Sequence, residues 1–110
     1  MMAPQINENK QHLVGTAAVA GYNTIIAAPG VSRHIVVHRF IIQNENPSAV
    51  TAQLCDYLSP HWRALLQNQG DALVMDFPVD DLWWLGLNAP LQLHLSGALT
   101  VGYSIEFEYA

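Results

Sequence analysis

Five histidines are the side chains of this sequence best suited to bind a metal ion. They are His12, His34, His38, His61 and His94. His34 and His38 are only four positions apart, in a segment (33–43) whose β-branched residues favour a strand. Four residues of strand span about 13 Å, whereas two ligands of one zinc ion must each lie within about 2.1 Å of it. The spacing therefore predicts no metal site, and we expect the histidines on the surface or in an interface.

The acidic residues and the single cysteine give no catalytic pattern. Asp76, Asp80 and Asp81 surround Pro78 without the glycine and ligand series of an EF-hand, so a solvated acidic loop is expected. Cys55 is expected on the outward face of a strand, with no Cys-His motif around it and no second cysteine for a disulfide. Nucleophile-elbow serines and phosphate-binding glycine loops are absent from the sequence. These observations predict a protein that is not an enzyme, with no catalytic residue and no cofactor.

The aromatic residues Tyr57, Trp62, Trp83 and Trp84 are the strongest candidates for binding. Successive residues of a strand point to opposite faces, so one of Trp83 and Trp84 is expected in the core and the other exposed or in an interface. Three interpretations stay open for this group. The rings can be core or self-association anchors, a hot spot for a partner protein, or a platform that stacks on sugar rings.

Composition limits the partners. The chain has 110 residues, which fits one domain of typical size. Charged residues make up 12% of it and the net charge is −5, against about 25% charged residues in an average domain. With only 4 Lys and Arg, the chain has no basic stripe for nucleic acid. No apolar run is long enough for a membrane helix. Residues 1–9 do not resemble a signal peptide. Because a small domain normally covers its surface with charge, the deficit indicates either an uncharged polar surface rich in Asn, Gln, Ser and Thr or a surface that another chain covers, and we favour the second.

Alternation of apolar and polar residues predicts strands throughout the chain after residue 12. The pattern is clearest in 99–109 and in 91–95, and Ser96-Gly97-Ala98 between them predicts a tight hairpin. Segment 33–43 is apolar on both faces, with Val36, Phe40 and Ile42 expected on one and Ile35, Val37 and Ile41 on the other, so it should be a central or covered strand. Further strands are expected at 14–19, 22–28, 48–57, 72–77 and 83–87.

Segment 59–70 is ambiguous. Ser59, Pro60 and Gly70 match the N-cap, first-turn and closing positions of a helix, with Trp62 and Leu65 on one face. The same residues fit a strand and a turn; we favour a short helical turn. The expected fold is all-β: a single-domain antiparallel β-sandwich, jelly-roll-like, of seven or eight strands over residues 13–110, preceded by a flexible N-terminal arm at residues 1–12.

The order of these segments resembles the small β-sandwich virion proteins of tailed bacteriophages. The resemblance covers about residues 13–110: an arginine-led apolar strand at 33–43, a small-residue strand with Ala49, Val50 and Thr51, a strand ending in Pro78, a tryptophan segment and the closing PLQLHLSGALTVGYSIEFEYA. It implies a capsid decoration (cement) protein that is made in the host cytoplasm and sits on the capsid exterior. It also implies a homotrimer bound to the major capsid protein, and a role for the arm along the capsid or a neighbouring subunit, with Ile6 as its apolar anchor.

The function expected from the sequence is therefore a non-enzymatic virion protein that self-associates, binds the capsid and stabilises it. The residues expected at its contacts are Ile6, Phe40, Trp62, Trp83 and Trp84. No nucleic acid, membrane or small-molecule ligand is expected. Two alternatives remain, a tail or neck accessory protein and a carbohydrate-binding or receptor-binding module that uses an exposed tryptophan.

Overall fold

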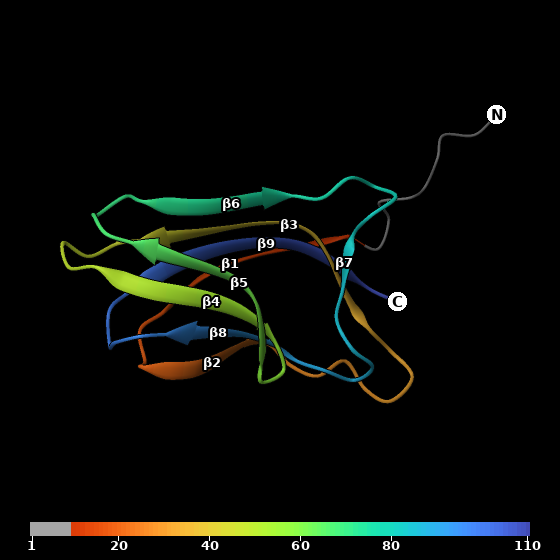
Figure 1. Cartoon of the computed structure of the whole chain (residues 1–110). Helices are drawn as coiled ribbons and strands as arrows, with labels where there is room; N and C mark the ends of the chain where they lie inside the picture. The colour runs from red at the N-terminus through yellow and green to blue at the C-terminus, as the bar shows by residue number, and fades with distance from the viewer. Residues whose placement is uncertain (1–9) are drawn as a thin grey trace.

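The computed structural model describes residues 10–110 as two antiparallel sheets packed face to face (Figure 1). Sheet A contains, in spatial order, β1 (Gln11–Ala17), β9 (Val101–Tyr109), β3 (Ile35–Asn44) and β6 (Ala72–Asp76), and the short β7 (Trp83–Trp84) also pairs with β3. Sheet B contains β2 (Gly21–Ile26), β8 (Leu91–Leu95), β4 (Val50–Asp56) and β5 (Ser59–Leu66). The expected all-β sandwich is confirmed, with nine strands instead of seven or eight. Residues 10–110 contain no helix that could cross a membrane.

The strand order is that of a jelly roll. When the two-residue β7 is set aside, β8 and β9 become the seventh and eighth strands, and the sheets read 1-8-3-6 and 2-7-4-5. Every connection between consecutive strands of this set then crosses from one sheet to the other, except the hairpin of β4 and β5. The jelly-roll prediction is confirmed by this order.

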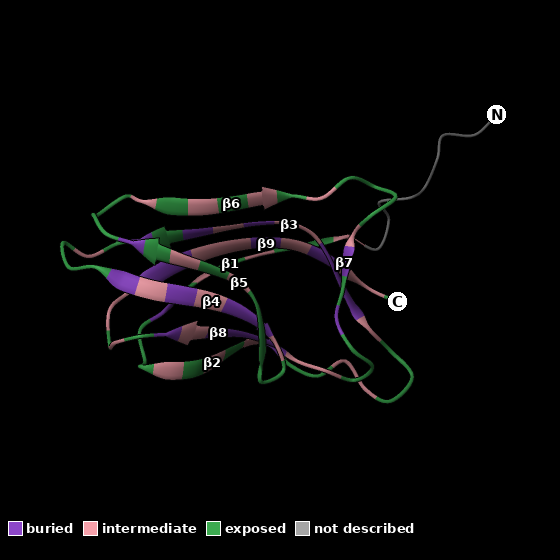
Figure 2. Ribbon diagram, viewed as in Figure 1, coloured by how far each residue is buried: buried purple, intermediate pink, exposed green. Residues whose placement is uncertain are grey.

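The core forms where the inward positions of the two sheets meet. In β4 the residues Val50, Ala52 and Leu54 are at most 1% exposed, as the alternation predicted. Leu91, Leu93 and Leu95 of β8 face the same core. Figure 2 shows buried residues concentrated on the central strands β9, β3, β8 and β4, and exposed ones on β2, β5 and β6. Each fully buried leucine of this kind contributes about 1.5–3 kcal/mol to folding.

The predicted hairpin at residues 91–109 is wrong. β8 pairs with β2 and β4 in sheet B, whereas β9 pairs with β1 and β3 in sheet A, so residues 96–100 connect the two layers. Ser96 is bound to β4 instead, since its backbone N donates to Thr51 O (3.0 Å) and its Oγ accepts from Thr51 N (2.8 Å). Alternation gives each strand one apolar face, and two such faces can lie on one sheet or oppose each other across a core. The sequence pattern is the same in both cases.

Strand β3 is central, as expected, but its faces were assigned incorrectly. The register with β9 shifts between Val37 and Arg39, so His38 is an extra residue in a β-bulge. The bulge places Ile35 and Val37 in the same core as Phe40, while Val36 is left out of that cluster. Period 2 holds on each side of the bulge and fails across it.

Segment 59–66 is a strand, so the favoured helical turn is wrong. Its ladder with β4 runs from Val50↔Leu66 to Asp56↔Ser59, and Trp62 and Leu66 point inward. β5 is the edge strand of sheet B, where a proline such as Pro60 is tolerated. The backbone pairs with β4 instead of closing helical hydrogen bonds, and this pairing overrides the capping signal.

The sandwich also begins earlier than predicted. β1 starts at Gln11, and His12 pairs with Glu106, so residues 11 and 12 belong to the sheet and not to the expected arm. Ile6 and the rest of residues 1–9 lie outside the described residues.

Asn44 links the end of β3 to sheet B. It is fully buried, and its Nδ2 donates to Ser48 O (2.9 Å) and to Leu66 O (3.1 Å). Its Oδ1 accepts from the backbone N of Asn46 (2.9 Å). All of its side-chain hydrogen-bonding groups are therefore used, which compensates the cost of burying them.

Candidate functional site

Three of the five predicted contact residues lie in an aromatic corner, defined here as Phe40, Trp62, Phe77 and Trp83. The ring centroids of Trp62 lie 5.4 Å from Phe77, 6.0 Å from Trp83 and 6.3 Å from Phe40. Phe40 is 0% exposed and Trp83 is 8% exposed. The folded domain therefore does not offer these two rings to a partner. The corner instead packs the side of the sandwich where β5 and β6 approach each other.

The indole N–H groups of this corner have no hydrogen-bond partner. Trp62 Nε1 and Trp83 Nε1 are both buried and unpaired within residues 10–110. The rings around them offer only weak N–H···π contacts. Edge-to-face ring pairs contribute about 0.5–1.5 kcal/mol each beyond area burial, so the corner serves packing.

Trp84 is the exposed tryptophan of the neighbouring pair. Its side chain is 55% exposed, whereas Trp83 is buried, which confirms that the two point to opposite faces. Its ring meets His34 edge to face at 5.4 Å, and His34 Nδ1 donates to Leu85 O at 2.8 Å. Trp84 is thus the predicted contact residue that remains well exposed to a ligand or partner.

The described histidine and acidic side chains do not gather at one place. His12 contacts Ser104 Oγ at 2.7 Å, and His38 is paired with the Glu108 carboxylate. Over residues 10–110, no group of three or more His, Cys, Asp or Glu side chains could hold a metal ion. Asp76 forms a 3.8 Å ion pair with Arg39 instead.

Part of the outer face of sheet B is covered by the chain itself, although Leu65 on the edge strand β5 is 59% exposed. The side chain of Tyr22 on β2 meets His94 on β8 edge to face at 4.7 Å, and its hydroxyl donates to Leu58 O (3.4 Å), just beyond β4. Between these strands, Gln92 is 8% exposed and Cys55 is 1% exposed, although both occupy outward positions.

Cys55 therefore lies on the predicted outward side of its strand, and this outward position is buried. The register with β5 shifts between Leu54 and Cys55, and the following turn brings Leu58 to Tyr22. Burial raises the pKa of the Cys55 thiol, partly offset by a hydrogen bond from the His94 backbone. The thiol is therefore neutral near pH 7 and is not an activated nucleophile.

The outer face of sheet A is open and regular. Its outward residues form three rows of four across β1, β9, β3 and β6, which we call the small row, the apolar row and the charged row. The small row is Thr16, Gly102, Gln43 and Ala72; the apolar row is Val14, Ser104, Ile41 and Val74; the charged row is His12, Glu106, Arg39 and Asp76. At the two ends of the apolar row, Val14 is 68% exposed and Val74 is 50% exposed.

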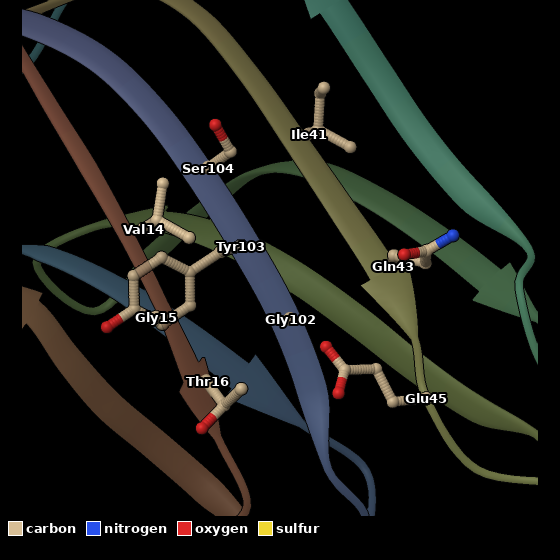
Figure 3. A pocket seen from close by; sticks show the side chains of 9 residues that line it. All are labelled: Val14, Gly15, Thr16, Ile41, Gln43, Glu45, Gly102, Tyr103 and Ser104. Atoms are coloured by element: carbon tan, nitrogen blue, oxygen red, sulfur yellow. The ribbon is translucent and has the colours of Figure 1, made fainter.

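A depression of about 380 Å³ opens between the small and apolar rows (Figure 3). Gly102 forms its floor, and a Cβ there would meet the Glu45 carboxylate, which reaches over this glycine from the end of β3. The depression thus exists because a glycine interrupts the outward side chains of β9. Gly15 on β1 similarly leaves space for the ring of Tyr103, since an added Cβ would lie 2.6 Å from the Tyr103 hydroxyl.

Compared with known proteins, the chain matches no family model and no curated protein. The site must therefore be argued from its own residues. The sequence prediction missed the valines of the apolar row, because it placed a strand at 14–19 without assigning its residues to the two faces of a sheet. The available signal was an apolar residue, Val14 or Val74, at an outward position of an edge strand.

Proposed function

We propose that this chain is a non-enzymatic structural protein of a tailed-bacteriophage virion, a capsid decoration protein that self-associates and binds and stabilises the shell. The observation that carries the proposal is the open outer face of sheet A. It presents Val14 and Val74 to solvent in a chain of which only 12% is charged. An open face that joins exposed valines to a row of charged side chains suits association with other protein surfaces.

The architecture supports the same class of function. Jelly rolls occur in viral capsid proteins, lectins and cupins. A fold shared by so many functions does not choose among them. The proposal therefore rests on the surface, where one sheet face is open and carries an apolar row with exposed valines at both ends.

Attachment to a shell requires no chemistry. Burial of apolar area contributes roughly 25 cal/mol per Å² before the costs of association. Many weak contacts repeated over a symmetric lattice then add up to stable decoration. The major capsid protein is the partner in this proposal, and the protein acts on the capsid exterior as a trimer, as the resemblance implies.

Fractionation of virions tests the proposal directly. Particles of the phage that encodes the chain are separated into heads and tails, and an antibody against the chain is used on each fraction. Detection in heads, with release when the shell is dissociated, is the expected result. Detection only in tails would favour the tail or neck accessory protein, and absence from both fractions would contradict a virion role.

A carbohydrate-binding function is the second candidate, because Trp84 is 55% exposed beside His34. A glycan array probed with the wild-type chain and with Trp84→Ala tests it. Leu65→Ala is the control, since Leu65 is a 59% exposed side chain of β5 outside the group of candidate binding aromatics. Glycan binding that is lost in Trp84→Ala and kept in Leu65→Ala would support this candidate, and an array without signal would remove it.

A further inference from the structure

We propose that the outer face of sheet A binds the same face of a second copy of this chain, about a two-fold axis parallel to the strands. Such an axis passes between β9 and β3, the two inner strands of the face. It places β1 of one copy over β6 of the other and β9 over β3. Each row then faces the same row of the second copy in reversed order. The inference deepens the proposed function, because it assigns the self-association to one face.

The charged row carries the argument. Across the sheet its order is His12, Glu106, Arg39 and Asp76, so basic and acidic side chains alternate. Reversal places Glu106 opposite Arg39 of the second copy, and His12 opposite Asp76. Within one chain Glu106 already pairs with Lys10 (3.2 Å) and Arg39 with Asp76 (3.8 Å), so the contacts between copies extend these ion pairs. Every pair joins groups of opposite or complementary character, and the two-fold axis makes each pair occur twice.

The other two rows fit the same reversal. In the apolar row, Val14 faces Val74 of the second copy, so the two most exposed apolar side chains of the face cover each other. In the small row, Gln43 faces Gly102, the floor of the depression; Gln43 is exposed, and its Nε2 donates to Gly70 O of its own chain at 3.2 Å. There the Gln43 amide can donate to the Glu45 carboxylate that reaches over this glycine.

The size of the face sets the strength of the contact. Four strands about 4.8 Å apart with three outward positions about 7 Å apart give a face of roughly 400 Å² in each copy. Stable specific interfaces bury about 1,200 Å² or more in total. The contact is therefore a weak dimer, with a dissociation constant above about 1 µM. A two-fold contact closes with two copies, so it joins neighbouring trimers on a shell and cannot itself build a trimer.

A charge swap between two separate chains tests the pairing. Glu106→Arg places arginine opposite Arg39, and Arg39→Glu places glutamate opposite Glu106, so each variant repels itself. In a mixture of the two variants, the new arginine at position 106 of one chain faces the new glutamate at position 39 of the other. The second contact, between the unchanged Arg39 of the first chain and the unchanged Glu106 of the second, is the same as in the wild type. The matched control is Arg63→Glu, the same reversal at an exposed position of β5 on the other sheet.

Sedimentation velocity over a micromolar to millimolar concentration series gives the readout. We expect a dimerising wild type, dimerisation at least about tenfold weaker in each face variant, recovery in the equimolar mixture and no change in Arg63→Glu. Circular dichroism checks folding; if a charge variant does not fold, Val14→Asp at the exposed valine replaces it. A monomeric wild type, a dimer or trimer unaffected by the face variants, or a mixture that does not recover would each overturn the inference. Virion fractionation is a separate readout, so the proposed function can fail while the dimer holds, and the reverse.

Discussion

The two outer faces of this sandwich are built from strands of the same geometry, but they differ in how far their outward side chains are exposed to other molecules. On sheet A, the outward residues form three complete rows whose ends are exposed, such as Val14 and Val74. On sheet B, the outward residues Cys55 and Gln92 are buried beneath the side chain of Tyr22 and the turn after β4. One face is open to another molecule, and part of the other is already occupied by its own chain.

This difference shows that an outward position in a sandwich is not the same as an exposed one. The parity of a strand determines which sheet face a side chain occupies. A long side chain on an edge strand determines whether that face remains accessible, and Tyr22 reaches from β2 to Leu58 beyond β4. Within its three rows sheet A has no comparable cover in its described residues, because the inner strand β9 presents Gly102 and Ser104 to the outside. Beyond these rows, Val36 at an outward position of β3 is 1% exposed.

A charge introduced on each outer face should give the largest difference in stability between the two faces. Cys55→Glu buries a carboxylate without a partner, so we expect the free energy of unfolding to fall by about 3–5 kcal/mol. Val74→Glu places a carboxylate on the outer face of sheet A, where it stays in water, so we expect the free energy of unfolding to change by no more than about 0.5 kcal/mol. Urea denaturation of both variants measures the difference. Equal losses would mean that the two faces do not differ in accessibility.

Removal of the Tyr22 side chain, which covers part of sheet B, should have the next largest effect on stability. In Tyr22→Ala the contacts with His94 and Leu58 are lost, and a fall of about 1–2 kcal/mol in unfolding free energy is expected. More diagnostically, Cys55 should react with a maleimide at least about tenfold faster under native conditions, since thiol reactivity follows exposure. Val14→Ala on the other sheet is the control and should leave the reaction rate unchanged. A rate that Tyr22→Ala does not alter would show that another group shields the thiol.

Much of the fold could be predicted from the sequence, because alternation over short segments reports a half-buried strand directly. The strands at 50–56, 72–76 and 101–109 were found in this way. Pairing was harder. The segments 91–95 and 99–109 were correctly read as strands and wrongly joined as a hairpin, because local alternation does not say which sheet a strand enters.

Bulges and edges account for the other differences. The extra residue at His38 changes the parity of β3, and no residue type in 35–41 marks it. At 59–66, Ser59 and Pro60 suit a helix start, but pairing with β4 supplies the backbone hydrogen bonds that decide the structure. Both effects come from the neighbouring strand, which the sequence of the segment does not contain.

The candidate site was predicted less well than the fold. Aromatic residues were favoured as contacts, yet Phe40 and Trp83 are needed to fill the corner where β5 approaches β6. The open face consists of ordinary residues such as Thr16, Ile41 and Val74, whose meaning appears only when the strands are placed side by side. A row across a sheet joins positions that are distant in sequence, so no local pattern reveals it.

Replacement of the buried glutamine should have a smaller effect, and a stabilising one. Gln92 Nε2 makes one long hydrogen bond to Thr24 Oγ1 (3.3 Å), and its Oε1 is buried without a partner among residues 10–110. Gln92→Leu removes the unpaired acceptor at similar volume, so a gain of about 0.5–1 kcal/mol in unfolding free energy is expected. Gln53→Leu, at a half-buried outward position of the same sheet, is the control. A loss of stability in Gln92→Leu would indicate that the glutamine is better satisfied than its contacts show.

The smallest expected effect is the pH dependence of stability that comes from the Cys55 thiol, which lies on the outer side of sheet B. Burial raises the pKa of the Cys55 thiol, so the folded chain keeps a proton that the unfolded chain releases above about pH 8.5. Since the unfolded state then binds fewer protons, stability is unaffected below that pH and falls as the pH rises through the folded pKa. The loss attributable to the thiol should stay below about 1 kcal/mol at pH 9. Urea denaturation of the wild type and of Cys55→Ala at pH 7 and pH 9 isolates the contribution of the thiol, because the variant lacks this ionisable group. An identical change in both would show that the thiol is as accessible to water as a residue on the open face.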